Sequence, residues 1–321
     1  MDIDKDVFRM VRVNEKTNPV DGHVYWSWKK SIWITSYLLI GIIGGILTYS
    51  IDSFLLFLAF TATTACLGHS LGMHRLLIHK SYKTPKWLEY LFIHLGTVFG
   101  MAGPFGMMYG HDIRDWAQRH PDCHDYLKHG SGFFKDGWWQ LHCNLALDYP
   151  PKFTPEKEVA EDKVYQFIEK TWMLQQLPWA ILFYLLGGWS WVIWGICVRI
   201  PIQLTGHWLV GYFAHNSGTR DWEIEGAAVQ GHNVDIAGLI TMGEAWHNNH
   251  HAFPGSAKMG IYEKQPDVGW WALKVLEKVG LVWDMKLPQD LPYREELKPI
   301  ANRKLQVEYS ALNIEISDEQ I

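Results

Sequence analysis

Eight of the 16 histidines in the chain lie at spacings that suit metal binding. They are His74, His79, His120, His124, His215, His247, His250 and His251. Residues three and four apart share one face of a helix, so the last three are expected to point together, as are His120, Cys123 and His124. Imidazole binds iron, zinc, copper and nickel. One tetrahedral ion uses four ligands, so this many histidines favours two ions.

The first pair, His74 and His79, has a different spacing. Five residues on a straight α-helix put two side chains ~140° apart. This pair is therefore expected either to straddle a helix end or to reach separate ions. A lone histidine is more often a core or surface residue than a ligand, but three sets beside the ends of apolar segments favour a metal site.

The composition indicates a membrane rather than nucleic acid. The 321 residues carry a formal net charge of −5, which provides no basic surface for a nucleic-acid partner. The 18 tryptophans suit a chain that meets lipid, because tryptophan marks the membrane interface. The four cysteines, Cys66, Cys123, Cys143 and Cys197, form no CxxC pair, so we expect them to be reduced.

Two long apolar regions predict the membrane spans. Residues 31–51 carry no charge, and after Asp52 residues 53–73 are again uncharged, which predicts a hairpin of two crossings. Residues 171–215 are long enough for a second hairpin, with its turn at 187–190. Basic residues flank the open end of the first hairpin, and by the positive-inside rule that end faces the cytoplasm. They are Lys29, Lys30, Arg75, Lys80, Lys83 and Lys86.

A third uncharged segment, residues 90–110, is a poor candidate for a lipid-facing helix. It contains five glycines, Pro104 and His94. If it crossed the membrane, His120 and His124 would lie on the opposite side from the other histidines. A shared metal centre therefore predicts that this segment lies at, or re-enters, the cytoplasmic face.

The predicted fold is an all-α membrane protein, in which four transmembrane helices in two hairpins carry a cytosolic helical cap with a histidine-rich site. The expected parts are a cytosolic N-terminal segment (1–30), a first hairpin (31–73), a cytosolic or interfacial region (74–170), a second hairpin (171–215) and a cytosolic region (216–321). Near the end of the last part, "VGWWALKVLEKVGLVWDM" has apolar residues at helical spacing. It predicts either an interfacial amphipathic helix or an ordinary surface helix.

The histidine motifs resemble those of a known family. The stretches "GMHRLLIHKSYK", "DWAQRHPDCHDYL" and "GEAWHNNHHAFPG" are similar to the three histidine boxes, HxxxxH, HxxHH and HxxHH, of the integral-membrane fatty-acyl desaturases of the stearoyl-CoA desaturase group. The stretch "HWLVGYFAHN" resembles the segment that carries an additional histidine ligand. The resemblance covers about residues 30–290. It implies that the eight histidines above are ligands of two irons, with O2 as co-substrate.

Two residues depart from the family pattern. Cys123 stands where the second box has its middle histidine, and Gly211 stands where acyl-CoA members carry an asparagine that holds a metal-bound water. The site is then cysteine-ligated, short of one ligand, or completed by a histidine such as His111, His129 or His142. A catalytically altered or silenced member is a further alternative. In another, Cys123 only packs and ligates nothing.

Charged residues near these positions are candidates for supporting roles. Asp112, Asp115 and Glu244 lie beside ligand positions and are expected to hold the outer N–H of ligating histidines, unless they are simply solvated. Arg199 interrupts the second apolar region. It either lines a substrate tunnel or satisfies backbone carbonyls.

The resemblance implies a membrane-bound, O2-dependent desaturase that introduces a cis double bond, Δ9-like, into a long acyl chain. Hydrogen removal from an unactivated methylene needs a metal-bound oxidant, which no side chain supplies. A related di-iron hydroxylase or monooxygenase is the nearest alternative. A non-enzymatic membrane metal-binding protein is the alternative from another class.

The expected partners follow from the same interpretation. The substrate is an acyl-CoA, an acyl carrier protein conjugate or an acyl-lipid. The sequence shows no haem, flavin or nicotinamide motif, so electrons are expected from an external ferredoxin or small cytochrome. We expect a multi-pass protein of the bacterial inner membrane, or of the endoplasmic reticulum in a eukaryote, with its active site on the cytoplasmic side.

Overall fold

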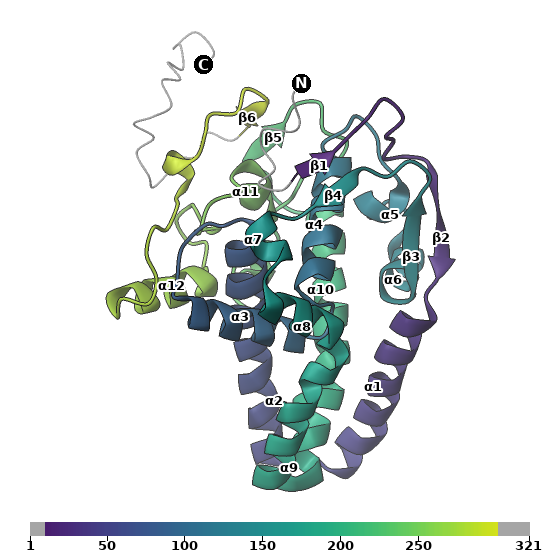
Figure 1. The fold of residues 1–321 in the computed structure, drawn as a ribbon, viewed down its shortest axis with the longest axis vertical. Coiled ribbons are helices and arrows are strands. Elements are labelled where there is room, and N and C mark those ends of the chain that lie inside the picture. Colours follow the sequence, from purple (N-terminus) through teal and green to yellow (C-terminus); the bar gives the residue numbers. More distant parts are fainter. Residues whose placement is uncertain (1–9, 301–321) are drawn as a thin grey trace.

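The fold is a stalk of long helices below a cap of shorter elements (Figure 1). The computed structural model describes residues 10–300, so residues 1–9 of the predicted N-terminal segment and residues 301–321 of the predicted C-terminal region lie outside it. Helices dominate, as the sequence predicts, but three small two-stranded antiparallel sheets also form in the described part. The expectation of an all-α chain is wrong to that extent.

Helices form the stalk and most of the cap. They are α1 Trp28–Leu47, α2 Ile51–Thr63, η2 Thr64–Ile78, α3 Lys86–Val98, α4 Pro104–Gln118, α5 Asp125–Lys128, α6 Phe133–His142, α7 Lys157–Ala160, α8 Lys163–Lys170, η3 Trp172–Gln175, α9 Gln176–Val192, η4 Ile193–Val198, α10 Arg199–Asn216, η5 Asp235–Ala237, α11 His247–Ala252, α12 Val268–Lys278 and η6 Pro288–Asp290. The sheets pair β1 Met10–Arg12 with β4 Lys152–Thr154, β2 Gly22–Trp26 with β3 Cys143–Leu147, and β5 Trp222–Ile224 with β6 Leu297–Pro299.

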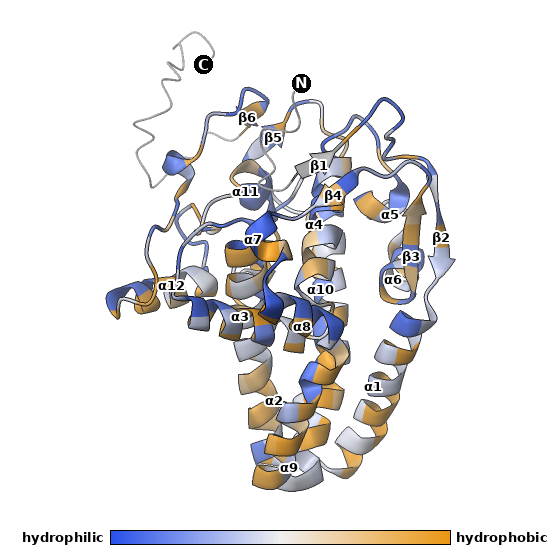
Figure 2. Cartoon of the chain, viewed as in Figure 1, coloured by the Kyte–Doolittle hydropathy of each residue, from blue (hydrophilic) through white to orange (hydrophobic). Residues whose placement is uncertain are grey.

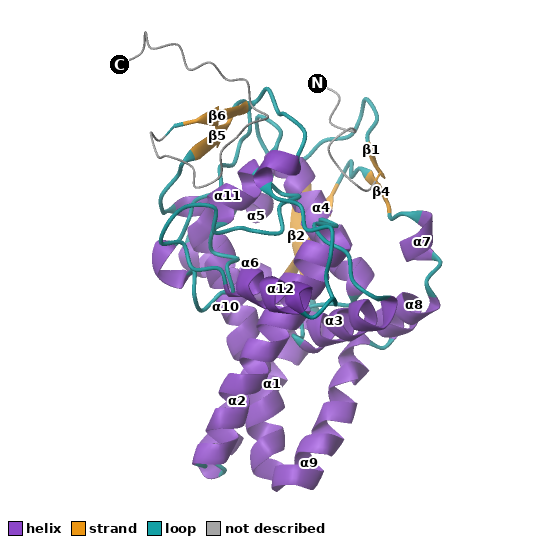
Figure 3. Cartoon of the chain, turned by 90° about the vertical axis from the view of Figure 1, so that its left-hand side faces the viewer, coloured by secondary structure: helices purple, strands orange, loops and turns teal. Residues whose placement is uncertain are grey.

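Three helical stretches are long and apolar enough to cross a membrane. They are Trp28–Leu47, Ile51–Ile78 and Trp172–Asn216, of which the third is 45 residues long. Hydrophobic residues concentrate along α1, α2 and α9, whereas the cap is largely hydrophilic (Figure 2). Viewed from the side, these helices project from one end of the cap (Figure 3). Their apolar side chains face outward, as Ile46 and Leu47 illustrate with 76% and 78% exposure, and such a surface suits lipid.

Hydrogen bonds tie together two segments that are distant in the sequence. Ser190 Oγ donates to the carbonyl of Thr48 at 2.7 Å, and Trp191 Nε1 donates to Asp52 at 2.6 Å. Thr48 lies between α1 and α2. Gly188 lies just before Ser190 and Trp191 in α9, and its φ of 64° and ψ of −156° interrupt that helix. Glycine suits this position because positive φ is costly for other residues.

Residues 90–110 form two helices, and neither is among the candidate spans. Helix α3 ends at Val98, and Gly100 follows with a φ of 105°. Pro104 then occupies the first turn of α4, where its missing N–H costs no helical hydrogen bond.

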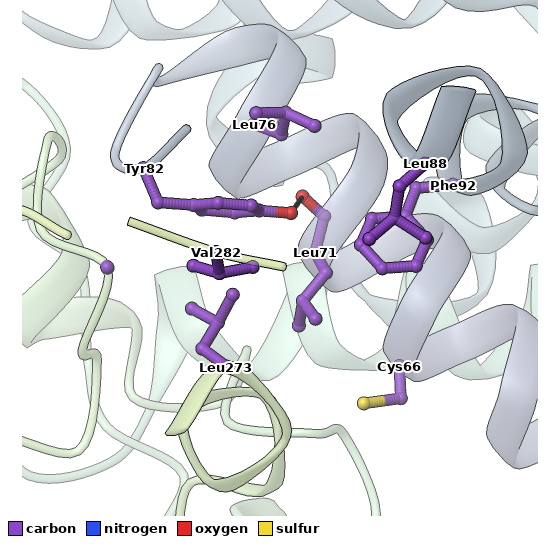
Figure 4. Close-up of a cluster of buried hydrophobic side chains, with 9 residues drawn as sticks. Cys66, Leu71, Leu76, Tyr82, Leu88, Phe92, Leu273 and Val282 are labelled. Carbon is purple, nitrogen blue, oxygen red and sulfur yellow. Dashed lines mark hydrogen bonds between the residues drawn. The ribbon is translucent and has the colours of Figure 1, made fainter. Parts of the chain in front are cut away.

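The core beneath the cap packs η2 against α3 and α12. Leu71 and Leu76 of η2 meet Leu88 and Phe92 of α3 and Leu273 of α12 in one buried cluster (Figure 4). Helices η2 and α3 approach so closely that a Cβ added at Gly68 would lie 2.4 Å from the backbone nitrogen of Gly96. This packing fixes the end of η2, where the first histidines lie.

Candidate metal centre

The structure gathers histidines into two groups. Among the described residues, the first histidine group is His74, His79, His111 and His250, and the second histidine group is His215, His247 and His251. In each group the potential donor atoms lie within 4.8 Å of one another. The nitrogens converge closely. His79 Nε2 lies 3.2 Å from His111 Nε2, and His247 Nε2 lies 3.1 Å from His215 Nε2 and 3.0 Å from His251 Nε2.

The helical form of η2 brings His74 and His79 together. The backbone N–H of His79 donates to the carbonyl of His74 at 3.0 Å, which is the i to i+5 closure of a π-helix. This wider winding turns the two side chains closer to one face than an α-helix would, and their ring centroids lie 4.8 Å apart. α-Helical geometry, on which the sequence prediction rests, would separate them. The pair does straddle the helix end, but both rings belong to one group.

Helix α11 lies between the two groups. His247 and His251, four residues apart, face the second group, whereas His250 faces the first. The expectation that all three point together is therefore only partly met, because a helix this short can contact both groups at once.

Two buried asparagines hold α11 in place. Asn248 accepts from the backbone N–H groups of Asp221 and Trp222 at 2.8 and 2.9 Å, and donates to the carbonyls of Trp222 and Gly231. Asn249 donates to the carbonyl of Met259 at 2.8 Å. The sequence analysis does not predict this role, although a pair of asparagines between closely spaced histidines is a signal for it. All four hydrogen-bonding positions of the Asn248 amide are used, which fixes the helix.

His111 of α4 joins the first group. From the sequence, His111 is predicted only as a substitute ligand, and the second box begins at His120. Counted from His111, the HxxHH spacing falls on Arg114 and Asp115. Both lie on the same face of α4 as His111.

The expectation that His120, Cys123 and His124 line the metal site is not met. Residues 119–124 are not helical, so the spacing does not bring the three side chains together. The Nδ1 of His120 lies 2.8 Å from the carbonyl of Trp116, and His124 Nδ1 accepts the N–H of Tyr126 at the start of α5. The proposed substitute His142 also lies outside both groups, with its Nδ1 2.9 Å from Ser31 Oγ.

Cys123 packs in an apolar cluster instead. It is 1% exposed and contacts a core that includes Trp116, Tyr126 and Leu127. Burial raises the pKa of the Cys123 thiol to about 11, so the thiol stays protonated at neutral pH. Cys123 belongs to neither histidine group in the described part of the chain, so the structure favours a packing role.

We therefore expect Cys123→Ala to leave the number of bound metal ions per chain unchanged, while costing about 1 kcal/mol of stability through the small cavity. Cys123→His should bind no additional metal and should destabilise the cluster by about 1–3 kcal/mol, because a larger ring does not fit. Elemental analysis of the purified variants decides. A gain of metal in Cys123→His would contradict the packing role.

Glu244 contacts the first histidine group through His74. Its carboxylate hydrogen-bonds His74 Nδ1 and accepts from Ser70 Oγ. Burial raises the pKa of Glu244, but the charge and hydrogen bond of His74 and the nearby Arg75 outweigh this and hold the pKa well below its usual value. An ionised carboxylate at Nδ1 fixes the ring so that Nε2 faces the group. The contact with His74 supports the predicted role of Glu244 as an outer partner of a ligand, which stays a prediction.

Replacing Glu244 by glutamine should weaken metal binding at the first group by about 10- to 100-fold. The substitution keeps the shape of the side chain but removes the negative charge that contacts His74. Titration of the stripped protein with Co2+ against a competing chelator measures the change. Glu225→Gln is the matched control, since Glu225 is exposed and pairs only loosely with Lys298 at 3.9 Å. Equal behaviour of the two variants would remove Glu244 from the site.

The two aspartates predicted beside the ligands lie on α4. Asp112 is buried, and its Oδ1 lies 3.3 Å from His111 Nδ1. Burial alone would raise the pKa of Asp115, but the charges of His111, His251 and Arg119 outweigh burial and lower this pKa to about 2. Asp115 is therefore a carboxylate close to both groups.

Arg199 lies inside the helical stalk rather than beside the groups. Its guanidinium is fully buried and donates to the carbonyls of Gly195 and Val98, at 2.7 and 2.9 Å, and to the side chains of Gln176 and Gln203. These contacts satisfy its donors and match the structural alternative.

The donor set is compatible with metal ions. Burial, together with the neighbouring imidazoles, lowers the pKa of His247 and His250 well below the usual value. Burial also lowers the pKa of His251, to about 4. Neutral imidazole is the form that binds metal. Without an ion, two imidazole nitrogens ~3 Å apart must share a proton in a hydrogen bond. In addition, His250 Nδ1 is buried with no hydrogen-bond partner in the described part of the chain.

Comparison with known proteins identifies the chain's relatives. The family model for fatty acid desaturases matches residues 52–285. The chain belongs to the fatty acid desaturase family. It is 38% identical over 225 residues to an sn-1 stearoyl-lipid 9-desaturase of Anabaena variabilis, covering 70% of this chain and 80% of the relative. It is 32% identical over 301 residues to an acyl-CoA C20 Delta5-desaturase of Anemone leveillei, covering 89% and 91%.

A third relative is the sn-1 stearoyl-lipid 9-desaturase of Synechocystis, 35% identical over 228 residues that cover 71% of this chain and 70% of the relative. Fatty acid desaturases are oxidoreductases that act on acyl chains. The resemblance drawn from the histidine motifs and the expectation of an oxidoreductase are thus confirmed.

Proposed function

We propose that this member of the fatty acid desaturase family is an O2-dependent enzyme that uses two irons to introduce a cis double bond, Δ9-like, into a long acyl chain. The observation that carries the proposal is the pair of converging histidine groups at the ends of apolar helices. The relatives named for lipid and acyl-CoA substrates support a long acyl chain on either carrier. An acyl carrier protein conjugate is the third candidate, and an external ferredoxin or small cytochrome is the proposed donor.

Iron, when bound, supplies the oxidising chemistry that removes hydrogen from unactivated methylene groups. The chain's own residues position that chemistry. Glu244 orients His74, and Asn248 and Asn249 fix the helix that contributes to both groups. A fixed set of ligands would hold the metal at one place relative to a bound acyl chain, and rate and product position depend on that placement.

We propose four crossings in two hairpins. The 45-residue stretch Trp172–Asn216 would span about 67 Å as one helix, twice the ~30 Å of a hydrocarbon core. Its interruption at Gly188 lies beside the α1–α2 connection, through the bonds of Ser190 and Trp191. Two turns at one end of the stalk support a pair of hairpins whose open ends meet the histidine groups, on the proposed cytoplasmic side of a bacterial inner membrane or of the endoplasmic reticulum.

The surface of α12 supports the same orientation. Trp271, Val275 and Val279 follow one another at helical spacing and are 52%, 62% and 64% exposed, whereas Leu273 on the other face is fully buried. We propose that this apolar stripe rests in the membrane interface.

Product analysis tests the function. The chain is expressed in a bacterial host together with a ferredoxin and its reductase, with and without oxygen, and total fatty acids are analysed by mass spectrometry. New cis-monounsaturated chains that require oxygen and are absent from a His250→Ala variant are expected. Hydroxylated chains would establish the hydroxylase alternative, and a protein that binds iron but forms neither product would overturn the proposal.

A further inference from the structure

Arg114 is the unusual member of the α4 face that carries His111. It stands three residues after His111, where the box spacing would place an imidazole. Its Nη1 donates to the carbonyl of Leu127 at 3.0 Å, and its Nη2 donates to Gln140 Oε1 at 3.0 Å. The same Nη1 also lies 2.7 Å from His129 Nε2. Arginine only donates hydrogen bonds, so it approaches His129 as a donor.

The other ring nitrogen of His129 is bound as well. Its Nδ1 lies 2.8 Å from Oδ2 of Asp136, a fully buried carboxylate that also accepts from Trp208 Nε1 at 2.8 Å. A carboxylate accepts, so Nδ1 carries the proton and Nε2 has the lone pair that Arg114 receives. The partners on both sides thus assign one neutral tautomer. The lone pair that a metal ion would need is taken up by a guanidinium.

His129 nevertheless lies beside the second histidine group. Its ring stacks on that of His215, with centroids 5.5 Å apart and an interplanar angle of 14°. Its Nε2 would lie 3.2 Å from a Cβ built at Gly211, one helical turn before His215. A fourth imidazole therefore stands next to a group of three.

We infer that Arg114 holds His129 away from the second histidine group and so limits the second metal site to three imidazoles. The inference rests on the proposed function, because it requires that both groups bind metal. The first site, with four imidazoles, then binds its ion more tightly. The second site has more open positions and a permanent positive charge nearby, so its ion is held more weakly and exchanges more readily.

Stepwise metal binding tests this assignment. The purified full-length protein is stripped of metal in mild detergent and titrated with Co2+ against a chelator, with the visible absorption of bound Co2+ as a second readout. The wild type should bind one ion tightly and a second more weakly. Arg114→Met should strengthen the second step by about 10- to 100-fold and change its spectrum, because His129 becomes a ligand. The first step reports whether the variant is still folded.

Three further variants make the test specific. His129→Ala should leave the second step unchanged, and the double variant Arg114→Met/His129→Ala should lose the gain of the single Arg114 variant. Arg119→Met removes a cation that acts on His251 without a bond to His129 in the described structure, and it should not reproduce the spectral change. If Arg114→Met does not fold, His129→Ala still decides.

The outcomes separate the two proposals. Weakening of the second step by His129→Ala would overturn the inference, because His129 would already be a ligand. No effect of a folded Arg114→Met would overturn it too. Absence of any tight Co2+ binding by the wild type would instead overturn the metal site on which the proposed function depends.

Discussion

Replacing His111 by alanine should abolish most product formation, by at least about 100-fold, and should remove about one metal ion per chain. His111 contributes one of four converging imidazoles, and its Nε2 lies 3.2 Å from that of His79. Loss of a ligand exceeds the 10- to 100-fold that is typical for loss of an outer partner. Elemental analysis and fatty-acid profiles of the same preparation provide the two measurements.

The informative comparison is His120→Ala. The sequence alone assigns His120 to the site, whereas its Nδ1 bonds the carbonyl of Trp116 and the ring stands outside both groups. We expect His120→Ala to retain its metal and to form product within a few fold of the wild type. If instead His120→Ala loses metal and His111→Ala retains it, the grouping of histidines described above is wrong.

The second large effect concerns stability and falls on Asp267. This carboxylate is 1% exposed, pairs with Arg75 at 2.8 Å, and accepts the backbone N–H groups of Met259 and Trp270 at 2.8 and 2.9 Å. Asp267→Ala should cost about 3–5 kcal/mol, because it leaves the fully buried Arg75 with only its longer contact to Glu244, at 3.8 Å. Thermal unfolding in detergent should occur roughly 5–15 °C lower.

Asp290→Ala is the matched control for this variant. Asp290 also accepts a backbone N–H, that of Leu287 at 2.8 Å, but it is exposed and pairs with no buried cation in the described structure. Its loss should cost about 1 kcal/mol or less. Similar shifts in the two variants would mean that Asp267 acts only as a helix cap and that Arg75 does not depend on it.

Much of the architecture could be predicted because apolar length and charge act locally. The uncharged segments on either side of Asp52 give two of the candidate spans, and the break near residue 188 falls where the glycines predicted a turn. One of the basic residues used to orient the first hairpin does not support that orientation. Arg75 is fully buried against Asp267 and is not a surface charge.

The candidate site was only partly predictable, because tertiary contacts decide which histidines meet. His120 and His124 have the right spacing but follow the end of α4 in non-helical backbone. His111 has no second histidine at the expected spacing, so it looked isolated. His250 and His251 are neighbours in the chain yet belong to different groups. Helical spacing describes one element at a time and cannot report the packing of α11 between two others.

If the first histidine group binds an ion, the π-helical turn at the end of η2 couples that binding to the winding of this apolar helix. Extended π-helix is a rare and less favourable form than α-helix. An ion that ligates both His74 and His79 would stabilise the five-residue closure, since α-helical winding would carry the two rings apart. By thermodynamic linkage, the winding of η2 then contributes to the affinity for the ion. Loss of the ion would favour rewinding, so the winding of this apolar helix would report whether the proposed metal site is occupied.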